Sequence, residues 1–177
     1  EDTSIMRTTV LPSMLEILVR NYNYRNKSVR LYELGRTYAL GGEDGLAIER
    51  KVLSLGAYGG GMDFFSLKGL VGAVLDSIRA KDVSYKACRT NPSYHPGRCA
   101  EVYVGERLIG VFGQIHPLVA SNYGVDAEFY CAELSFEALM ASVGEDPTYV
   151  PLPRFPAVTR DIALVCDAGI PVAELKR

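Results

Sequence analysis

The sequence of 177 residues contains no tryptophan, only two histidines and only four cysteines. The cysteines are Cys88, Cys99, Cys131 and Cys166. None of them belongs to a C-x-x-C pair and no cluster of histidines lies beside them, so the sequence contains no complete zinc-binding motif. Apolar runs such as 52–57 and 70–75 are far shorter than the roughly 20 residues that cross a bilayer. We therefore expect a reduced, cytoplasmic protein that holds no metal and does not enter a membrane.

The chain also lacks a large excess of positive or negative charge. The chain carries 19 Lys and Arg residues against 21 Asp and Glu residues, which gives a formal net charge of -2. This balance provides no basic field over the whole chain, so DNA is not an expected partner and any RNA contact must be a local patch. The hydrophobic fraction of 48% and the charged fraction of 23% are typical of globular proteins and argue against disorder.

Two segments have the periodicity of amphipathic helices. The first covers 12–25, where Ser13 followed by Glu16 resembles a capping box. Its apolar stripe consists of Met14, Leu15, Leu18, Val19 and Tyr22. Asp63 can cap the second helix, whose apolar side chains share one face over about four turns. Both segments are expected to be helices.

Several shorter segments have the composition of strands. They are 29–34, 36–40, 51–57, 99–104, 107–115 and 129–134. Gly105 and Glu106 join two of these segments through a two-residue loop that suits a type II′ hairpin, so the two strands should pair antiparallel. Short helices are expected over 118–122 and 136–143. Strands grouped in hairpins with helices between them predict an α+β fold, with an antiparallel sheet flanked by helices.

Four prolines mark a boundary near the end of the chain. They are Pro147, Pro151, Pro153 and Pro156. Because prolines cannot donate hydrogen bonds to a sheet, the sequence predicts a first domain over 1–146, a proline-rich linker over 147–156 and an incomplete second domain over 157–177. Within the second domain, 157–167 has the pattern of a strand and 171–177 that of a helix start.

Two features could carry chemistry. The segment Gly56–Gly61 lies between a strand and a helix, where backbone N–H groups can bind phosphate. It lacks the Lys-Ser/Thr pair of a P-loop, and Asp63 would repel an anion, so a tight connection is the simpler interpretation. His95 and His116 have no sequence partner that defines a triad or a metal site. A hydrolase or transferase that uses either histidine with a cysteine or a carboxylate stays open as an alternative.

Two candidate binding surfaces also stand out. Arg154 and Arg160 flank an aromatic residue at the start of the second domain, so a contact with RNA phosphate is one hypothesis and a solvated or locally paired side chain is the other. Tyr22 and Tyr24 widen the apolar stripe of the first helix, which suits either core packing or a partner surface. An independent RNA-binding module is a further alternative, and it would need a basic groove lined by aromatic side chains.

Five segments, in the order of the chain, resemble one known family. They are Met6–Leu15, Val29–Gly35, Phe65–Gly69, His95–Arg98 and Ile109–Pro117. Together they are similar to the catalytic-like module of bacterial phenylalanyl-tRNA synthetase beta subunits. After the prolines, Phe155–Val165 resembles the opening strand of the ferredoxin-like anticodon-binding domain in the same family.

The resemblance implies a class II synthetase fold in a heterotetramer of two alpha and two beta subunits, which uses ATP to attach phenylalanine to its tRNA. ATP and Mg²⁺ then serve the whole enzyme, and neither is expected on this chain. Because the alpha subunit holds the active site in this family, the implied partners are the alpha subunit and tRNA(Phe), and no residue of this chain is expected to be catalytic. The likeness also implies a subunit interface on the first helix, at Leu15, Leu18, Val19 and Tyr22.

The residues agree with a loss of catalysis. Class II active sites place one arginine on a central strand against the ATP phosphates and a second at the end of a glycine-rich motif. Arg30 and Glu33 lie on the strand where the first arginine could be sought. The corresponding later segment, Phe129–Leu139, contains neither glycine nor arginine, and its Glu133 and Glu137 add negative charge. The sequence therefore predicts a scaffold that binds nucleotide poorly.

Overall fold

The computed structural model describes residues 5–42, 45–149, 151–170 and 172–175 of the chain. The chain divides into two compact units, Glu1–Glu145 and Asp146–Arg177. The elements of the first unit are α1 (Leu11–Asn23), β1 (Ser28–Ala39), β2 (Ile48–Gly59), α2 (Phe64–Ser77), β3 (Val83–Ala87), β4 (Tyr94–Val104), β5 (Arg107–Ile115), α3 (Pro117–Asn122), β6 (Tyr130–Ser135) and α4 (Phe136–Met140).

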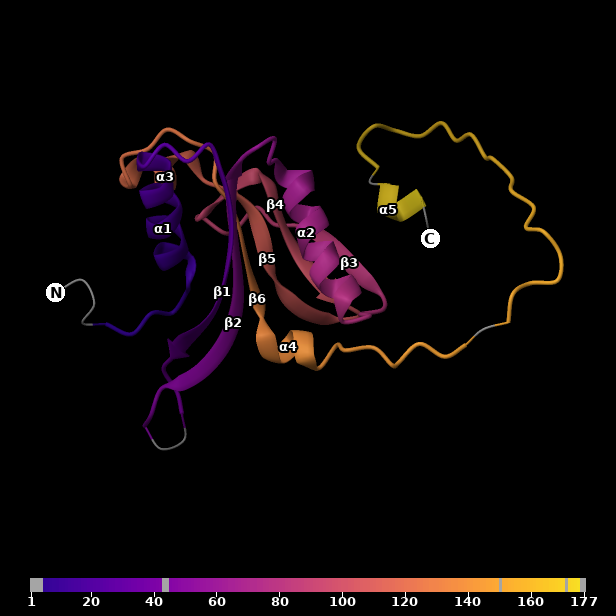
Figure 1. The fold of residues 1–177 in the computed structure, drawn as a ribbon, viewed down its shortest axis with the longest axis horizontal. Coiled ribbons are helices and arrows are strands. Elements are labelled where there is room, and N and C mark those ends of the chain that lie inside the picture. Colours follow the sequence, from indigo (N-terminus) through magenta and orange to yellow (C-terminus); the bar gives the residue numbers. More distant parts are fainter. Residues whose placement is uncertain (1–4, 43–44, 150, 171, 176–177) are drawn as a thin grey trace. The chain divides into compact units, whose positions relative to one another are not determined.

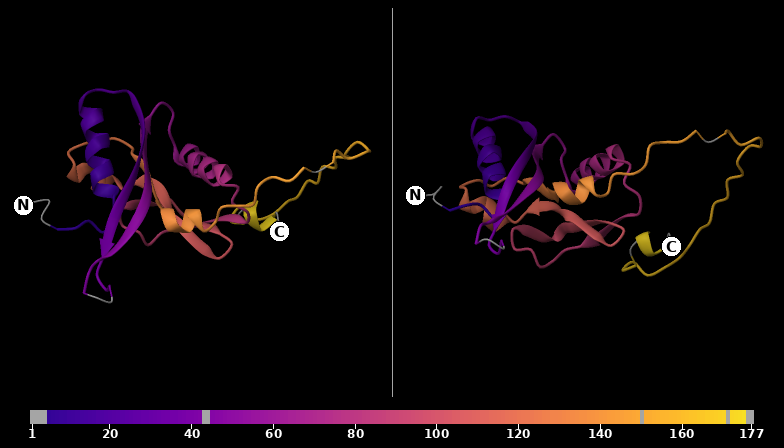
Figure 2. Two further views of the ribbon diagram at one scale, coloured as in Figure 1. Left: turned by 60° about the horizontal axis from the view of Figure 1, so that its bottom comes forward. Right: turned by 90° about the horizontal axis from the view of Figure 1, so that it is seen from below.

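A six-stranded antiparallel sheet in the order β1-β2-β6-β5-β4-β3 forms the middle layer of the first unit (Figure 1). Helix α1 covers one face and α2 covers the other (Figure 2). Neighbouring residues of β2 show this division, because Gly56 faces Met14 of α1 whereas Ala57 belongs to the core beneath α2. The predicted α+β fold with an antiparallel sheet flanked by helices is confirmed.

Helix α1 begins without a side-chain cap. Its N-cap residue is Val10, and a proline lies in its first turn. The predicted capping box is wrong, because Ser13 lies inside the helix and its hydroxyl accepts a hydrogen bond from Nη1 of Arg7 at 3.0 Å. The backbone N–H of Val10 is satisfied by Glu133 on β6 instead.

The cap predicted for α2 is confirmed. The carboxylate of Asp63 accepts a hydrogen bond from the backbone N–H of Ser66 at 2.6 Å, and hydrogen bonds from Ser66 lower the pKa of Asp63. Leu67, Val71 and Leu75 form the inner face of the helix and are fully buried. The sequence signals for the start and the inner face of α2 therefore agree with the structure.

Strand β1 runs without a break through Gly35, where the sequence suggested two segments. A Cβ at this position would lie 2.7 Å from Nη2 of Arg7 and 2.8 Å from Oε1 of Glu33, so the glycine leaves room for that side-chain pair. The predicted hairpin between β4 and β5 is confirmed, and Gly105 adopts the positive φ of 57° that its turn requires.

Strand β3 was not predicted. It is a short edge strand that pairs only with β4, and its residues Ser84 and Lys86 are exposed. Polar residues on the solvent side of so short a segment leave little hydrophobic signal in the sequence.

In the second unit, the described residues form one helix, α5 (Val172–Leu175). This helix lies within the predicted range 171–177, whose other residues, 171, 176 and 177, lie outside the described ranges. The strand predicted over 157–167 is wrong, because these residues are all described, are exposed and form no strand. A strand is stabilised by hydrogen bonds to a neighbouring strand, and the described part of this unit supplies none.

Candidate functional site

The face of the sheet beneath α1 is filled by a hydrophobic core. Leu15 and Leu18 are 2% and 0% exposed, Val19 is 9% exposed, and all three pack into a cluster to which β2, β4, β5 and β6 contribute. Three of the four residues predicted for a subunit interface are therefore used by the core of this chain and have little surface left for a partner. The fourth, Tyr22, is 39% exposed.

Arg7 ties the segment before α1 to strand β1. Its guanidinium forms an ion pair with Glu33 at 2.8 Å and donates to the backbone carbonyl of Arg36 at 2.9 Å. It also donates to the hydroxyl of Ser13. Glu33 is therefore paired within the chain, and Arg30, which the sequence considered beside it, is exposed on β1.

The two acids of the segment after Phe129 have structural roles. Glu133 accepts hydrogen bonds from the backbone N–H of Val10 at 2.6 Å and from the hydroxyl of Thr9 at 2.7 and 2.8 Å, which joins β6 to the start of α1. Glu137 accepts a hydrogen bond from the backbone N–H of Lys51 at 2.9 Å, and this bond lowers the pKa of Glu137. Both carboxylates are therefore engaged by the chain itself.

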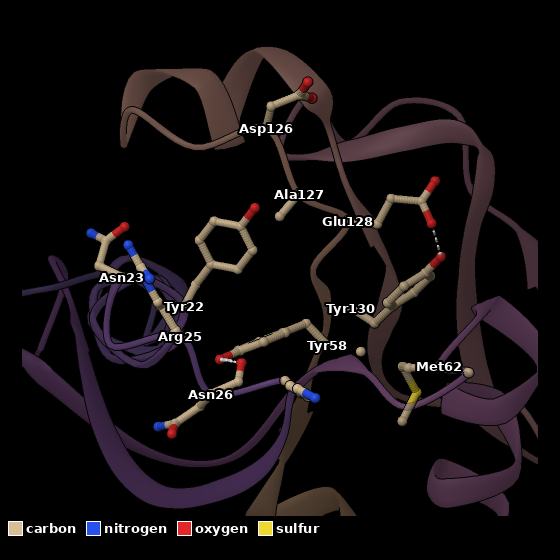
Figure 3. Close-up of a pocket in the computed structure, with 13 residues that line it drawn as sticks. Tyr22, Asn23, Arg25, Asn26, Tyr58, Met62, Asp126, Ala127, Glu128 and Tyr130 are labelled. Carbon is tan, nitrogen blue, oxygen red and sulfur yellow. Dashed lines mark hydrogen bonds between the residues drawn. The ribbon is translucent and has the colours of Figure 1, made fainter.

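A cavity of about 750 Å³ opens between the C-terminal end of α1, the glycine-rich turn after β2 and the segment before β6 (Figure 3). The rings of Tyr22 and Tyr58 meet edge to face, with centroids 5.9 Å apart. The hydroxyl of Tyr58 donates to the backbone carbonyl of Asn26 at 2.9 Å, and that of Tyr130 donates to Glu128 at 2.8 Å. Ring contacts and hydrogen bonds thus hold the aromatic walls in place.

Both signs of charge line this cavity. Arg25 and Lys27 supply basic groups, and Asp126 and Glu128 supply acidic ones. The hydrogen bond from Tyr130 lowers the pKa of Glu128, whereas burial and the bond to Glu128 raise the pKa of Tyr130 to about 12. Such a lining suits a polar or aromatic group better than a polyanion such as a triphosphate.

Of the cavity residues, the sequence pointed to Tyr22 as part of a partner surface and to the segment Gly56–Gly61, which was weighed as a phosphate site and interpreted as a tight connection. The run of asparagines, tyrosines and basic residues over 21–27 is a signal for the part of the cavity that follows α1. Tyr58 and Tyr130 come from strands that are distant in sequence, and the register that sets Tyr130 opposite Ala57 brings both to the cavity. That part of the cavity has no sequence signal of its own.

The two histidines lie close together, with ring centroids 6.4 Å apart. Nδ1 of His95 accepts a hydrogen bond from the backbone N–H of Gly97, and Nδ1 of His116 accepts one from the backbone N–H of Leu118 at the start of α3. Among the described residues, neither imidazole is hydrogen-bonded to a serine, threonine or cysteine side chain. The hydrolase alternative therefore lacks the paired nucleophile and base that it needs.

Arg154 and Arg160, which the sequence considered for RNA contacts, differ in environment from Arg98 and Arg107 of the first unit. Arg154 and Arg160 are exposed in the second unit, in a segment without regular structure. In the first unit, Arg98 forms an ion pair with Glu128 at 3.3 Å, and Arg107 donates to a backbone carbonyl after α4 at 2.8 Å. The guanidiniums of Arg98 and Arg107 therefore both have partners within the first unit.

Other chemistry has no support among the described residues. No group of three or more histidine, cysteine, aspartate or glutamate side chains there is arranged to hold a metal ion. In the same residues, no helix is long and apolar enough to cross a membrane. All four cysteines are free thiols, of which only Cys166 is exposed.

Known sequences give a specific match. The profile of the phenylalanyl tRNA synthetase beta chain CLM domain matches residues 1–136. A phenylalanine-tRNA ligase beta subunit of Clostridium acetobutylicum is 38% identical over 177 residues, which cover 99% of this chain and 22% of that protein. The beta subunit of Clostridium tetani is 39% identical with the same coverage, and that of Geobacter sulfurreducens is 36% identical and covered over 24% of its length. This chain therefore spans between a fifth and a quarter of the length of these relatives.

Solved structures give a likeness of fold. A structure of the pyrrolysyl-tRNA synthetase PylSc of Desulfitobacterium hafniense superposes with a TM-score of 0.62 at 14% identity, covering 81% of this chain and 55% of that one. A second pyrrolysyl-tRNA synthetase structure from the same organism gives a TM-score of 0.61. At this identity the likeness shows the fold alone, and it agrees with the predicted synthetase-like sheet flanked by helices.

Proposed function

Since the chain belongs to the phenylalanyl-tRNA synthetase beta chain family, we propose that it forms a catalytic-like but inactive module of a phenylalanine-tRNA ligase beta subunit. In this role it acts as a scaffold in a cytoplasmic heterotetramer with alpha subunits, which charges tRNA(Phe) in an ATP-dependent reaction of class II type. ATP and Mg²⁺ serve the assembled enzyme at a site on the alpha subunit. The second unit is the start of a ferredoxin-like anticodon-binding domain in this proposal.

The position of Glu133 carries the proposal that the module is inactive. A triphosphate needs cationic groups around it, whereas this carboxylate stands on the central strand β6 and is fixed by Val10 and Thr9. Glu137 adds a second carboxylate to the segment that corresponds to the glycine-rich motif. The core beneath α1 fills the same face of the sheet. These residues do not fit a bound ATP.

The proposed contact with the alpha subunit lies on helix α1. Leu15, Leu18 and Val19 support this contact indirectly, because they hold the helix on the sheet. Ile17 lies away from this core, and Tyr22 packs its ring on Tyr58 at the C-terminal end of the helix, yet each side chain keeps 39% of its surface exposed. Tyrosine and exposed apolar side chains are typical of the central part of protein interfaces.

A contact with tRNA is proposed for the second unit, where Arg154 and Arg160 are exposed. Because phosphate contacts release counterions, neutralising either arginine should weaken tRNA binding by the assembled enzyme and reduce its dependence on salt. Equal affinity and an equal salt slope for the variant and the parent would argue against this role.

The experiment that tests the proposed function mixes the purified chain with the alpha subunit of the same organism. Sedimentation measures association, and calorimetry measures ATP binding to each protein alone. We expect a complex, with ATP binding to the alpha subunit and none to this chain. ATP binding by this chain in the micromolar range would overturn the proposed inactivity, and failure to associate would overturn the scaffold role.

A matched pair of variants locates the contact. Tyr22→Ala removes an exposed side chain of α1, and Glu106→Ala removes one at the tip of the β4–β5 hairpin. Both variants should stay folded by circular dichroism, and only Tyr22→Ala should weaken association. Equal affinities for the two variants would show that α1 is not part of the interface.

A further inference from the structure

Cys88 and Cys99 face each other at the end of the ladder between β3 and β4. Ala87 pairs with Ala100, so the next pair along the two strands is Cys88 and Cys99. The backbone N–H of Cys88 donates to the carbonyl oxygen of Cys99 at 3.0 Å. Residues joined in this way have Cα atoms roughly 5.5 Å apart, inside the range of about 4.4–6.8 Å that a disulfide spans.

The two thiols have different chemical environments. Sγ of Cys88 lies 3.9 Å from Oγ1 of Thr90. Burial raises the pKa of Cys88, but hydrogen bonds from the backbone N–H groups of Thr90 and Asn91 outweigh it and lower this pKa below its usual value. Burial and the neighbouring Cys88 raise the pKa of Cys99 to about 12. Cys88 is therefore the thiol that more readily becomes a nucleophile.

The other two cysteines do not share this geometry. Cys99 lies opposite Gly113 of β5, and Gly113 lies opposite Cys131 of β6, so one strand separates the two cysteines. Because neighbouring strands are about 4.8 Å apart, their Cα atoms are roughly 10 Å apart, which is beyond the reach of a disulfide. Cys166 belongs to the second unit and is exposed.

We propose that Cys88 and Cys99 form an oxidation site that hydrogen peroxide converts into a disulfide. The Cys88 thiolate attacks one oxygen of the peroxide, the S–O bond forms as the O–O bond breaks, and the released hydroxide takes up a proton to become water. The sulfur of Cys99 then attacks the sulfenic acid on Cys88. The S–S bond forms, the S–O bond breaks, and the departing hydroxide leaves as water with the proton of Cys99. The two thiols lose two electrons, and the peroxide is reduced to two water molecules.

The position of the site gives the oxidation a structural consequence. β3 is an edge strand that only β4 holds in the sheet, and the bond closes the segment between Cys88 and Cys99 that contains His95. The disulfide therefore pins this edge of the sheet. The site depends on the register of β3 with β4 and is independent of the proposed scaffold role.

The test treats the reduced 177-residue chain with hydrogen peroxide under native conditions and maps its peptides without reduction. A Cys166→Ser background removes the exposed thiol. We expect a linked pair of peptides that contain Cys88 and Cys99, and we expect dithiothreitol to reverse the link. In a Cys99→Ser variant, dimedone should trap a sulfenic acid on Cys88. In a Cys88→Ser variant, the Cys99 thiol should be lost about tenfold more slowly than in the background chain.

Two outcomes would overturn the proposal. One is a peptide map in which Cys131 is linked to either partner. The other is a chain with all four cysteines whose Cys88 and Cys99 stay reduced at a peroxide concentration that oxidises Cys166. Alkylation of the untreated chain by iodoacetamide gives an independent measurement if a serine variant does not fold. Cys88 should then react faster than Cys99, and the reverse order would also overturn the proposal.

Discussion

The carboxylate of Glu133 on β6 accepts a hydrogen bond from the backbone N–H of Val10 at 2.6 Å, although the two residues are 123 positions apart in the chain. Val10 is the N-cap of α1, which has no side-chain cap of its own. A negative charge at a helix N-terminus is stabilised by the helix dipole and by the N–H groups that lack partners there. The carboxylate of Glu133 therefore fixes α1 to β6, which is a central strand of the sheet and the last strand in the sequence.

Removing this carboxylate should destabilise the first unit. In Glu133→Ala, the N–H of Val10 and the hydroxyl of Thr9 lose their acceptor, so we expect a loss of about 1–3 kcal/mol in the free energy of unfolding, measured with urea. Glu133→Gln keeps one acceptor oxygen and should lose less. Glu106→Ala, at the exposed hairpin tip, should change stability by less than about 0.5 kcal/mol. Equal losses in the two alanine variants would contradict the role of Glu133.

Two glycines should respond to alanine in opposite directions. A Cβ at Gly56 would lie 2.5 Å from Sδ of Met14, which is fully buried, so Gly56→Ala should lose about 1–3 kcal/mol through overpacking. A Cβ at Gly69, inside helix α2, meets nothing within 4 Å, and Gly69→Ala should gain about 0.5–1 kcal/mol. Thermal and urea unfolding measure both changes. A stabilised Gly56→Ala chain would show that α1 does not press on the sheet at this point.

A buried hydroxyl without a partner leads to a third prediction. The hydroxyl of Tyr94 has no hydrogen-bond partner in the described structure, and the side chain is 1% exposed. Tyr94→Phe should therefore keep the stability of the chain or raise it by about 1 kcal/mol, whereas Tyr94→Ala should lose about 3–5 kcal/mol.

The matched control for Tyr94 is Tyr58→Phe. Tyr58 is also buried, at 4% exposure, but its hydroxyl donates to the backbone carbonyl of Asn26. This variant should lose about 1 kcal/mol. If Tyr94→Phe and Tyr58→Phe lose the same free energy of unfolding, the hydroxyl of Tyr94 has a partner in solution.

Local signals allowed much of the fold to be predicted. Asp63 caps α2 through a residue three positions away, and Gly105 turns a hairpin whose two strands adjoin it. Both depend on neighbours in sequence, which periodicity and turn chemistry describe well. The resemblance to a known family predicted a synthetase-like antiparallel sheet flanked by helices. The solved structures with a similar fold agree with this prediction.

The parts that were not predicted depend on distant partners. Glu133 was expected to repel a nucleotide, and only the register of β6 places it at the start of α1. From the sequence alone, Leu15 and Leu18 could belong to the core or to a partner surface, because an amphipathic pattern does not identify what packs against it. The structure places both residues in the core. The strand expected over 157–167 has the composition of a strand but no neighbouring strand to pair with among the described residues.

The last prediction concerns alkaline pH and Tyr130 in the cavity. Burial and its hydrogen bond to Glu128 raise the pKa of Tyr130 to about 12, above the value near 10 of an unfolded tyrosine. Because the folded chain holds this proton more tightly, its contribution to stability is complete below about pH 10 and is lost as the pH rises through about 12. Tyr130→Phe cannot ionise at this position, so its stability should fall less steeply over this range.

Absorbance of the phenolate in the near ultraviolet measures the ionisation behind this pH dependence. The difference between the parent chain and Tyr130→Phe isolates one tyrosine, and its midpoint should lie near pH 12. Because burial and the hydrogen bond to Glu128 raise the pKa of Tyr130, a midpoint near the value of about 10 for an unfolded tyrosine would mean that the contact between Tyr130 and Glu128 does not persist in solution.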